Sequence, residues 1–148
     1  MSATRKAYRS AILHSIADPA EVGIEASFEY YEDGLLVVDN GQISRLGHAS
    51  DLLPTLPADI EVVHYQDKLI TPGFIDTHIH FPQTGMIGSY GEQLLDWLNT
   101  YTFPCEKQFA DKDHADKVAK IFIEELLRNG TTTALVFGSV HPESVLSL

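Results

Sequence analysis

Two histidines at alternate positions, His78 and His80, are the residues of this chain best suited to metal chemistry. They lie in the stretch LITPGFIDTHIHFPQ, residues 69–83, whose β-branched residues predict a strand. In a regular strand, residues i and i+2 point to the same face, so we expect Asp76, His78 and His80 on one face. Two neutral imidazoles are good ligands for Zn²⁺. The same spacing also allows the alternative of two solvated strand histidines.

The place of the two histidines within their strand favours a functional site. Pro72-Gly73 interrupts the chain before the strand, and Phe81-Pro82 ends it. The histidines therefore lie at the carboxyl end of a short strand, where the catalytic groups of an α/β barrel gather. Asp76 is placed either to orient one imidazole or to cap a neighbouring strand.

The residues that follow alternate between patterns of helix and strand. Residues 84–91 are glycine-rich and predict a loop. Residues 92–101 predict a short helix that ends at Phe103-Pro104. Its inward residues are expected to be Leu94, Leu95, Leu98 and Tyr101, and Trp97 is expected either in the core or in a pocket wall. A helix over 111–128 is capped by Asp111 or Asp113 and ended by Asn129-Gly130. His114, in its first turn, is expected on the solvated surface. A buried strand over 131–137 and a helix from Pro142 complete the alternation, which is typical of a parallel α/β fold. His141 lies near the expected rim, as a substrate contact or as a helix start.

Residues 1–68 have the pattern of a small β domain. Strands are predicted over 8–16, 35–38, 42–46 and 60–66, with a loop over 17–25 and a short helical turn over 49–53. Asp39-Asn40-Gly41 predicts a tight hairpin turn, because Asn-Gly readily adopts the positive φ angles of type I′. His14, His48 and His64 are scattered without ligand spacing, and we interpret them as structural or solvated.

Composition excludes several classes of protein. The chain has 148 residues and a net charge of −11, which argues against nucleic acid or an anionic membrane as its main partner. Its one cysteine, Cys105, excludes an internal disulfide. We find no apolar run long enough to span a membrane and no signal-peptide pattern, and therefore expect a cytoplasmic protein.

The segment PGFIDTHIH, residues 72–80, resembles the first barrel strand of the metal-dependent amidohydrolase superfamily. The segments FPQ (81–83), GEQLLDWLNTYTFPCEKQF (91–109) and LLRNGTTTALVFGSVH (126–141) resemble the guanine deaminase family within it. The resemblance implies an α/β fold: the start of a TIM-like (β/α)₈ barrel over 69–148, preceded over 1–68 by part of a small β-sandwich. A full barrel takes about 250 residues, so we expect a truncated, N-terminal piece of such an enzyme.

The same resemblance implies the site. His78 and His80 are the expected metal ligands, with one zinc ion per subunit and iron not excluded. His80, Phe81, Pro82 and Gln83 are expected to bind the substrate, guanine, which the family hydrolyses to xanthine and ammonia. The other ligands and the proton-shuttling residue come from later strands, so no catalytic residue is assigned here. The resemblance also implies a homodimer.

Two alternatives stay open. The parent protein is either a guanine deaminase or another amidohydrolase acting on a heterocyclic amine or a cyclic amide. The 148-residue chain alone is also interpretable as a non-catalytic, incomplete fold, because two ligands rarely hold zinc tightly.

Overall fold

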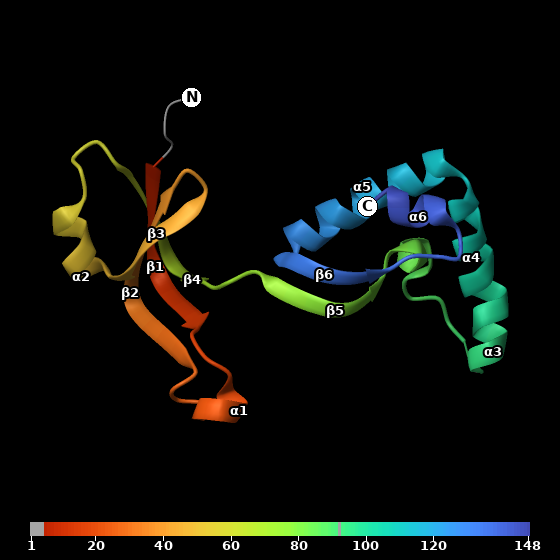
Figure 1. The fold of residues 1–148 in the computed structure, drawn as a ribbon, viewed down its shortest axis with the longest axis horizontal. Coiled ribbons are helices and arrows are strands. Elements are labelled where there is room, and N and C mark those ends of the chain that lie inside the picture. The colour runs from red at the N-terminus through yellow and green to blue at the C-terminus, as the bar shows by residue number, and fades with distance from the viewer. Residues whose placement is uncertain (1–4, 92) are drawn as a thin grey trace. The chain divides into compact units, whose positions relative to one another are not determined.

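The structure is a computed structural model that describes residues 5–91 and 93–148. The chain divides into two compact units, one ending at Pro72 and the other running over Gly73–Leu148 (Figure 1). The predicted division at residues 68 and 69 falls inside a strand that continues to Ile70. That division stays a prediction.

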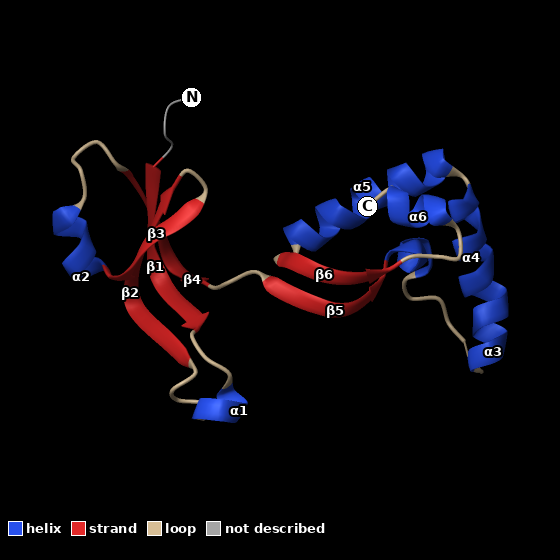
Figure 2. Cartoon of the chain, in the orientation of Figure 1, coloured by secondary structure: helices blue, strands red, loops and turns tan. Residues whose placement is uncertain are grey.

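The first unit is a four-stranded sheet in the order β3-β2-β1-β4 (Figure 2). Its strands are β1 (Arg5–Ser15), β2 (Phe28–Asp39), β3 (Gln42–His48) and β4 (Glu61–Ile70). β1 pairs antiparallel with β2 and parallel with β4, and β2 pairs antiparallel with β3. Two one-turn helices, α1 (Pro19–Val22) and α2 (Ala49–Leu52), lie in the connections, and a 3₁₀ turn over Leu53–Thr55 follows α2.

A small apolar cluster holds the first unit together. Ala7, Leu35, Val37 and Ala49 are buried, and leucines from the α2 region pack against them. The predicted hairpin turn is confirmed, because Asn40 and Gly41 have φ angles of 51° and 79°. β2 begins seven residues before the predicted strand at 35–38. The prediction missed its first half, which is mostly exposed.

The second unit pairs β5 (Phe74–His80) in parallel with β6 (Thr131–Phe137). The long helix α5 (Lys112–Arg128) lies along one face of this pair (Figure 1). A 3₁₀ turn, η2 (Phe81–Met86), follows β5 directly, and α6 (Pro142–Leu146) follows β6. Between η2 and α5 a continuous helical segment comprises α3 (Leu94–Trp97), a π turn (Leu98–Thr102), α4 (Phe103–Lys107) and a 3₁₀ turn (Gln108–Ala110).

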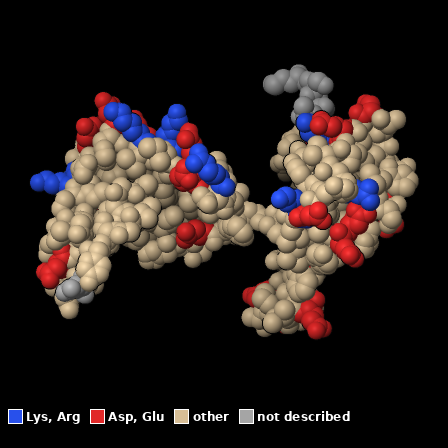
Figure 3. Space-filling view, turned by 180° about the vertical axis from the view of Figure 1, so that it is seen from behind, with Lys and Arg blue, Asp and Glu red and all other residues tan. Residues whose placement is uncertain are grey.

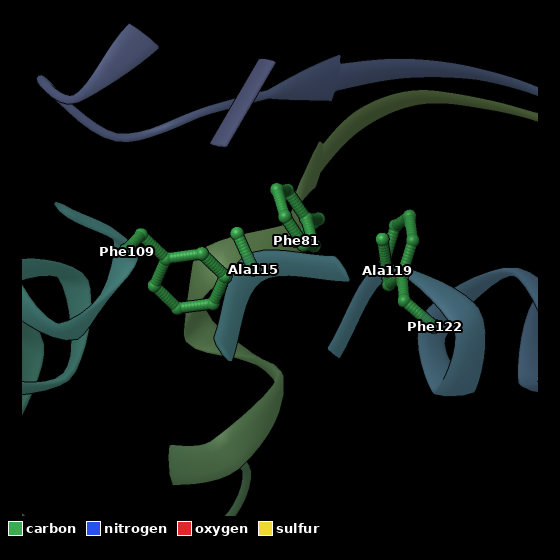
Figure 4. Packing of buried hydrophobic residues seen from close by; sticks show 5 residues of the cluster. All are labelled: Phe81, Phe109, Ala115, Ala119 and Phe122. Atoms are coloured by element: carbon green, nitrogen blue, oxygen red, sulfur yellow. The ribbon is translucent and has the colours of Figure 1, made fainter. Parts of the chain in front are cut away.

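Three aromatic rings form the centre of the second core. Phe81, Phe109 and Phe122 pack with Ala115 and Ala119, and Figure 4 shows the Phe81 ring between the other two. The ring centroids of Phe81 and Phe109 are 5.0 Å apart at an interplanar angle of 85°, an edge-to-face arrangement. Because Phe81 comes directly after β5, its burial fixes the end of that strand.

The start and end of α5 were predicted correctly from the residues at its two ends. Asp111 is the cap, since its Oδ1 accepts hydrogen bonds from the backbone N–H groups of Asp113 at 2.9 Å and His114 at 3.4 Å. Gly130, at a φ of 84°, follows the helix end as predicted. His114 is half-buried, and its ring is nearly perpendicular to that of Phe109 at a centroid distance of 4.9 Å, which corrects the expectation of a solvated side chain.

Three expectations for the second unit were wrong. The helical segment does not end at Phe103-Pro104: the π turn is wide enough to carry Pro104, which has no N–H, into the first turn of α4. Leu94, Leu95 and Tyr101, expected inward, are exposed. β6 was expected to be buried, but in the described chain α5 covers one of its faces, so Leu135 stays 61% exposed.

Charge is unevenly distributed over the face of the second unit that Figure 3 shows. On this face most Lys, Arg, Asp and Glu side chains lie on the α5 side, and the rest carries few charges. Among the described residues, no helix combines the length and apolar character that crossing a bilayer requires.

Replacing Gly73 by alanine is expected to destabilise the second unit. A Cβ atom at Gly73 would overlap the side chain of Thr132 on β6, so the pairing of β5 with β6 must shift. We expect a loss of about 1–3 kcal/mol in the free energy of unfolding, measured by urea denaturation. Gly85→Ala is the matched control, because its Cβ would meet only Cys105 Sγ at an ordinary 3.7 Å. Equal stability of the two variants would contradict the close approach at Gly73.

Candidate metal centre

The two imidazoles converge at the carboxyl end of β5. The Nε2 atoms of His78 and His80 are 3.0 Å apart, which confirms that both rings share one side of the strand. Two nitrogens that each lie about 2.0–2.1 Å from one ion are about 3 Å from each other. The pair therefore fits two adjacent positions in the coordination sphere of a single metal ion.

An irregularity in β5 contributes to this arrangement. Three positions separate Asp76 from Ile79, whereas two separate their partners Ala134 and Val136 on β6, so β5 carries one extra residue. Such a bulge re-aims the side chains beside it. Strict alternation therefore does not hold through Asp76, and the expectation that it shares a face with the histidines does not follow. Its Oδ1 accepts a hydrogen bond from the backbone N–H of His78 at 3.0 Å, so it supports the backbone of the bulge.

Phe137, the last residue of β6, lies against both imidazoles. Its ring centroid is 4.6 Å from that of His78 and 4.9 Å from that of His80, and His80 is its partner in the strand pairing. The aromatic ring limits where the imidazoles can turn. Its role was missed from the sequence, although its place at the end of a predicted parallel strand pointed to the same rim.

The described residues bring two candidate ligands together and place no third beside them. No group of three or more His, Cys, Asp or Glu side chains that could hold a metal occurs within 5–91 and 93–148. His141 is the N-cap residue of α6, and its carbonyl accepts a hydrogen bond from the buried Ser144 hydroxyl at 2.7 Å. Of its two possible roles, the helix start is the one that the described contacts support.

A pocket of about 450 Å³ adjoins the histidine pair. Its polar lining includes His78, His80, Gln83 and Glu125, and its apolar lining includes Met86, Trp97, Phe122 and Leu126. Trp97, for which core and pocket wall were both open, forms part of this wall, and its indole N–H donates to the Ser89 carbonyl at 3.0 Å.

The four residues expected at the substrate differ in their surroundings. His80 and Gln83 line the pocket, and Gln83 Nε2 is 3.4 Å from His80 Nδ1. Phe81 and Pro82 are buried, and neither lines the pocket. In this structure they anchor the chain between His80 and Gln83, and their contact with substrate stays a prediction.

Two residues of α4, both missed from the sequence as site residues, contact η2. The Cys105 thiol donates to the Pro82 carbonyl at 3.3 Å, and Glu106 Oε1 accepts from Gln83 Nε2 at 3.0 Å. Burial raises the pKa of the Cys105 thiol above its usual value, and the nearby charge of Glu106 raises it further.

Comparison with known proteins identifies the family to which the chain belongs. Residues 69–148 match the model of the amidohydrolase family, so the chain belongs to that family of metal-dependent enzymes. It is 47% identical over 148 residues to the guanine deaminase of Escherichia coli (strain K12), covering 98% of this chain and 33% of the relative.

Solved structures agree with that likeness. The structure of E. coli guanine deaminase matches with a TM-score of 0.86 at 46% identity, over 97% of this chain and 33% of that one. A guanine deaminase from C. acetobutylicum, with guanine bound in its active site, matches with a TM-score of 0.76 at 28% identity, over 97% and 32%. The predicted α/β fold of an amidohydrolase is confirmed. The chain spans about a third of the length of the relatives it matches.

The 148-residue chain is expected to bind zinc weakly, because two imidazoles leave a coordination sphere that catalytic sites complete with a third protein ligand. Titration with ZnCl₂ followed by calorimetry should detect binding that weakens as the pH falls, since the imidazoles must be deprotonated to bind. His78→Ala and His80→Ala should each abolish it. His64→Ala, which also removes one imidazole, should leave it unchanged; equal losses in all three variants would contradict a site at the pair.

Cys105 is expected to react slowly with iodoacetamide at pH 8. A raised pKa lowers the fraction of thiolate, which is the reactive form, at any pH below that pKa. Alkylation followed by mass spectrometry should be several-fold slower in the folded chain than in urea. Glu106→Gln should speed the folded-state reaction by removing one cause of the raised pKa. A folded rate equal to the rate in urea would show that the thiol is not shielded.

Proposed function

We propose that this chain forms the first part of a guanine deaminase, an enzyme that hydrolyses guanine to xanthine and ammonia. The observation that supports this most directly is the convergence of the His78 and His80 nitrogens, 3.0 Å apart, beside a pocket that Gln83 also lines. The likeness to guanine deaminases over nearly the whole of this chain supports the same substrate.

In this proposal His78 and His80 hold one zinc ion per subunit, with iron as the alternative. A bound ion of this kind lowers the pKa of a water ligand, so that hydroxide is available at neutral pH. The remaining ligands and the proton-shuttling residue belong to the part of such an enzyme that this chain does not span.

The chain's own residues bind the base and keep water away from it. Gln83 offers a planar amide that can pair with the edge of a purine, and Met86, Trp97 and Leu126 provide apolar walls. The buried Phe81 holds the end of β5, and with it the position of His80 relative to Gln83. A homodimeric, cytoplasmic enzyme is part of the proposal.

A chimaera tests the proposed activity. Residues 1–148 replace the matching third of E. coli guanine deaminase, and guanine hydrolysis is followed by the release of ammonia. We expect activity on guanine, and a loss of at least about 100-fold in kcat/KM with His78→Ala, because even outer-shell changes at metal sites cost about 10–100-fold.

His64→Ala, on the first unit, serves as the control and should keep its activity. A folded chimaera that ignores guanine but hydrolyses another heterocyclic amine or a cyclic amide would assign these residues to a different amidohydrolase.

A further inference from the structure

A carboxylate from α4 determines how the Gln83 amide is turned. Glu106 Oε1 lies 3.0 Å from Gln83 Nε2, and both side chains are half-buried. An ionised carboxylate has acceptors and no donor, so the NH₂ group of Gln83 must face it. Because the amide is planar, the carbonyl oxygen Oε1 of Gln83 is then turned away from Glu106.

Further hydrogen bonds fix the two segments that the Glu106–Gln83 contact joins. The residue before Glu106 and the residue before Gln83 are also in contact, since the Cys105 thiol donates to the Pro82 carbonyl at 3.3 Å. Thr84 Oγ1 donates to the Phe81 carbonyl at 2.6 Å and closes the first turn of η2. Consecutive residues of α4 therefore meet consecutive residues of η2, and Glu106 has a fixed position relative to Gln83.

Gln83 is also a residue of the pocket wall. It lines the pocket together with His78 and His80, and its Nε2 is 3.4 Å from His80 Nδ1. The orientation of its amide thus decides whether a ligand beside the histidine pair meets a donor or an acceptor. Glu106 does not line the pocket.

We propose that Glu106 is a positioning residue that keeps the carbonyl oxygen of Gln83 available as an acceptor for a ring N–H of the substrate. This inference rests on the proposed function for the identity of the substrate. A purine whose facing nitrogen carries a hydrogen is favoured, whereas one that presents a methyl group or a bare nitrogen meets a carbonyl oxygen and is rejected. Neutralising Glu106 removes the preference, because either end of the amide can then face its new partner.

The first test observes the amide itself in the 148-residue chain. In ¹⁵N-labelled protein, the side-chain NH₂ signals of Gln83 should be shifted from those of a free glutamine. Glu106→Gln should move them toward free values, while the spectrum of the backbone stays close to that of the parent. Glu124→Gln, an equal change of charge on the exposed face of α5, should leave them in place. Unmoved Gln83 signals in a folded Glu106→Gln variant overturn the proposal.

The second test measures selectivity in the chimaera. Guanine is compared with 1-methylguanine, 7-methylguanine and 9-methylguanine, each of which has one ring nitrogen blocked. We expect Glu106→Gln to raise KM for guanine by up to about tenfold with a smaller change in kcat. The ratio of kcat/KM for guanine to kcat/KM for the methylguanine whose methyl group faces Gln83 should fall. Glu106→Asp should restore part of this ratio. Unchanged KM and unchanged selectivity in Glu106→Gln overturn the positioning role.

The two tests separate the two claims. A chimaera with no activity on guanine removes the proposed function and the substrate named here. The Gln83 signals then still decide whether Glu106 fixes the amide. An active chimaera with unaltered Gln83 signals removes the role of Glu106 and leaves the proposed function standing.

Discussion

The burial of one aromatic ring, that of Phe81, is the contact on which the geometry of the second unit depends. Phe81 follows His80 without an intervening residue, and its ring is enclosed by Phe109, Phe122 and two alanines. Extended chain therefore has to stop at His80 and turn into η2 immediately. This packed ring, with the buried Pro82 beside it, fixes the strand end and the start of the turn, so that the pocket residues His80 and Gln83 lie on either side of the two buried residues.

The elements predicted correctly are those whose start, end and residue pattern can be recognised from neighbouring residues in the sequence. α5 and β6 were predicted with almost their observed bounds, because an aspartate cap, an apolar stripe and an Asn-Gly stop delimit the helix, and β-branched residues mark the strand. The first half of β2 was missed, since it forms by pairing with β1, where Arg9 also forms an ion pair with Asp33. No local pattern encodes such a contact.

The candidate site likewise contains residues that could be predicted from the sequence and residues that could not. The histidine pair and Gln83 lie within six residues of one another, so spacing and residue type were enough to predict them as site residues. Phe137 and Glu106 support those residues from other elements, and each has an unremarkable setting in the sequence. The bulge in β5 is also hidden, because it depends on how β5 and β6 are matched. Sequence therefore predicted the groups proposed to touch a ligand and missed the side chains that contact those groups.

The π turn over Leu98–Thr102 has a consequence for how such a site can vary. Each residue of an α-helix advances about 100° around the axis, so one extra residue in a wide turn rotates everything after it by about that angle. Cys105 and Glu106 follow this turn and meet η2 on the side that the rotation gives them. The number of residues in the segment, and not their types, therefore sets the direction in which the side chains of α4 point around the helix axis. A single insertion or deletion upstream would present a different side of that helix to the pocket wall without altering any residue within it.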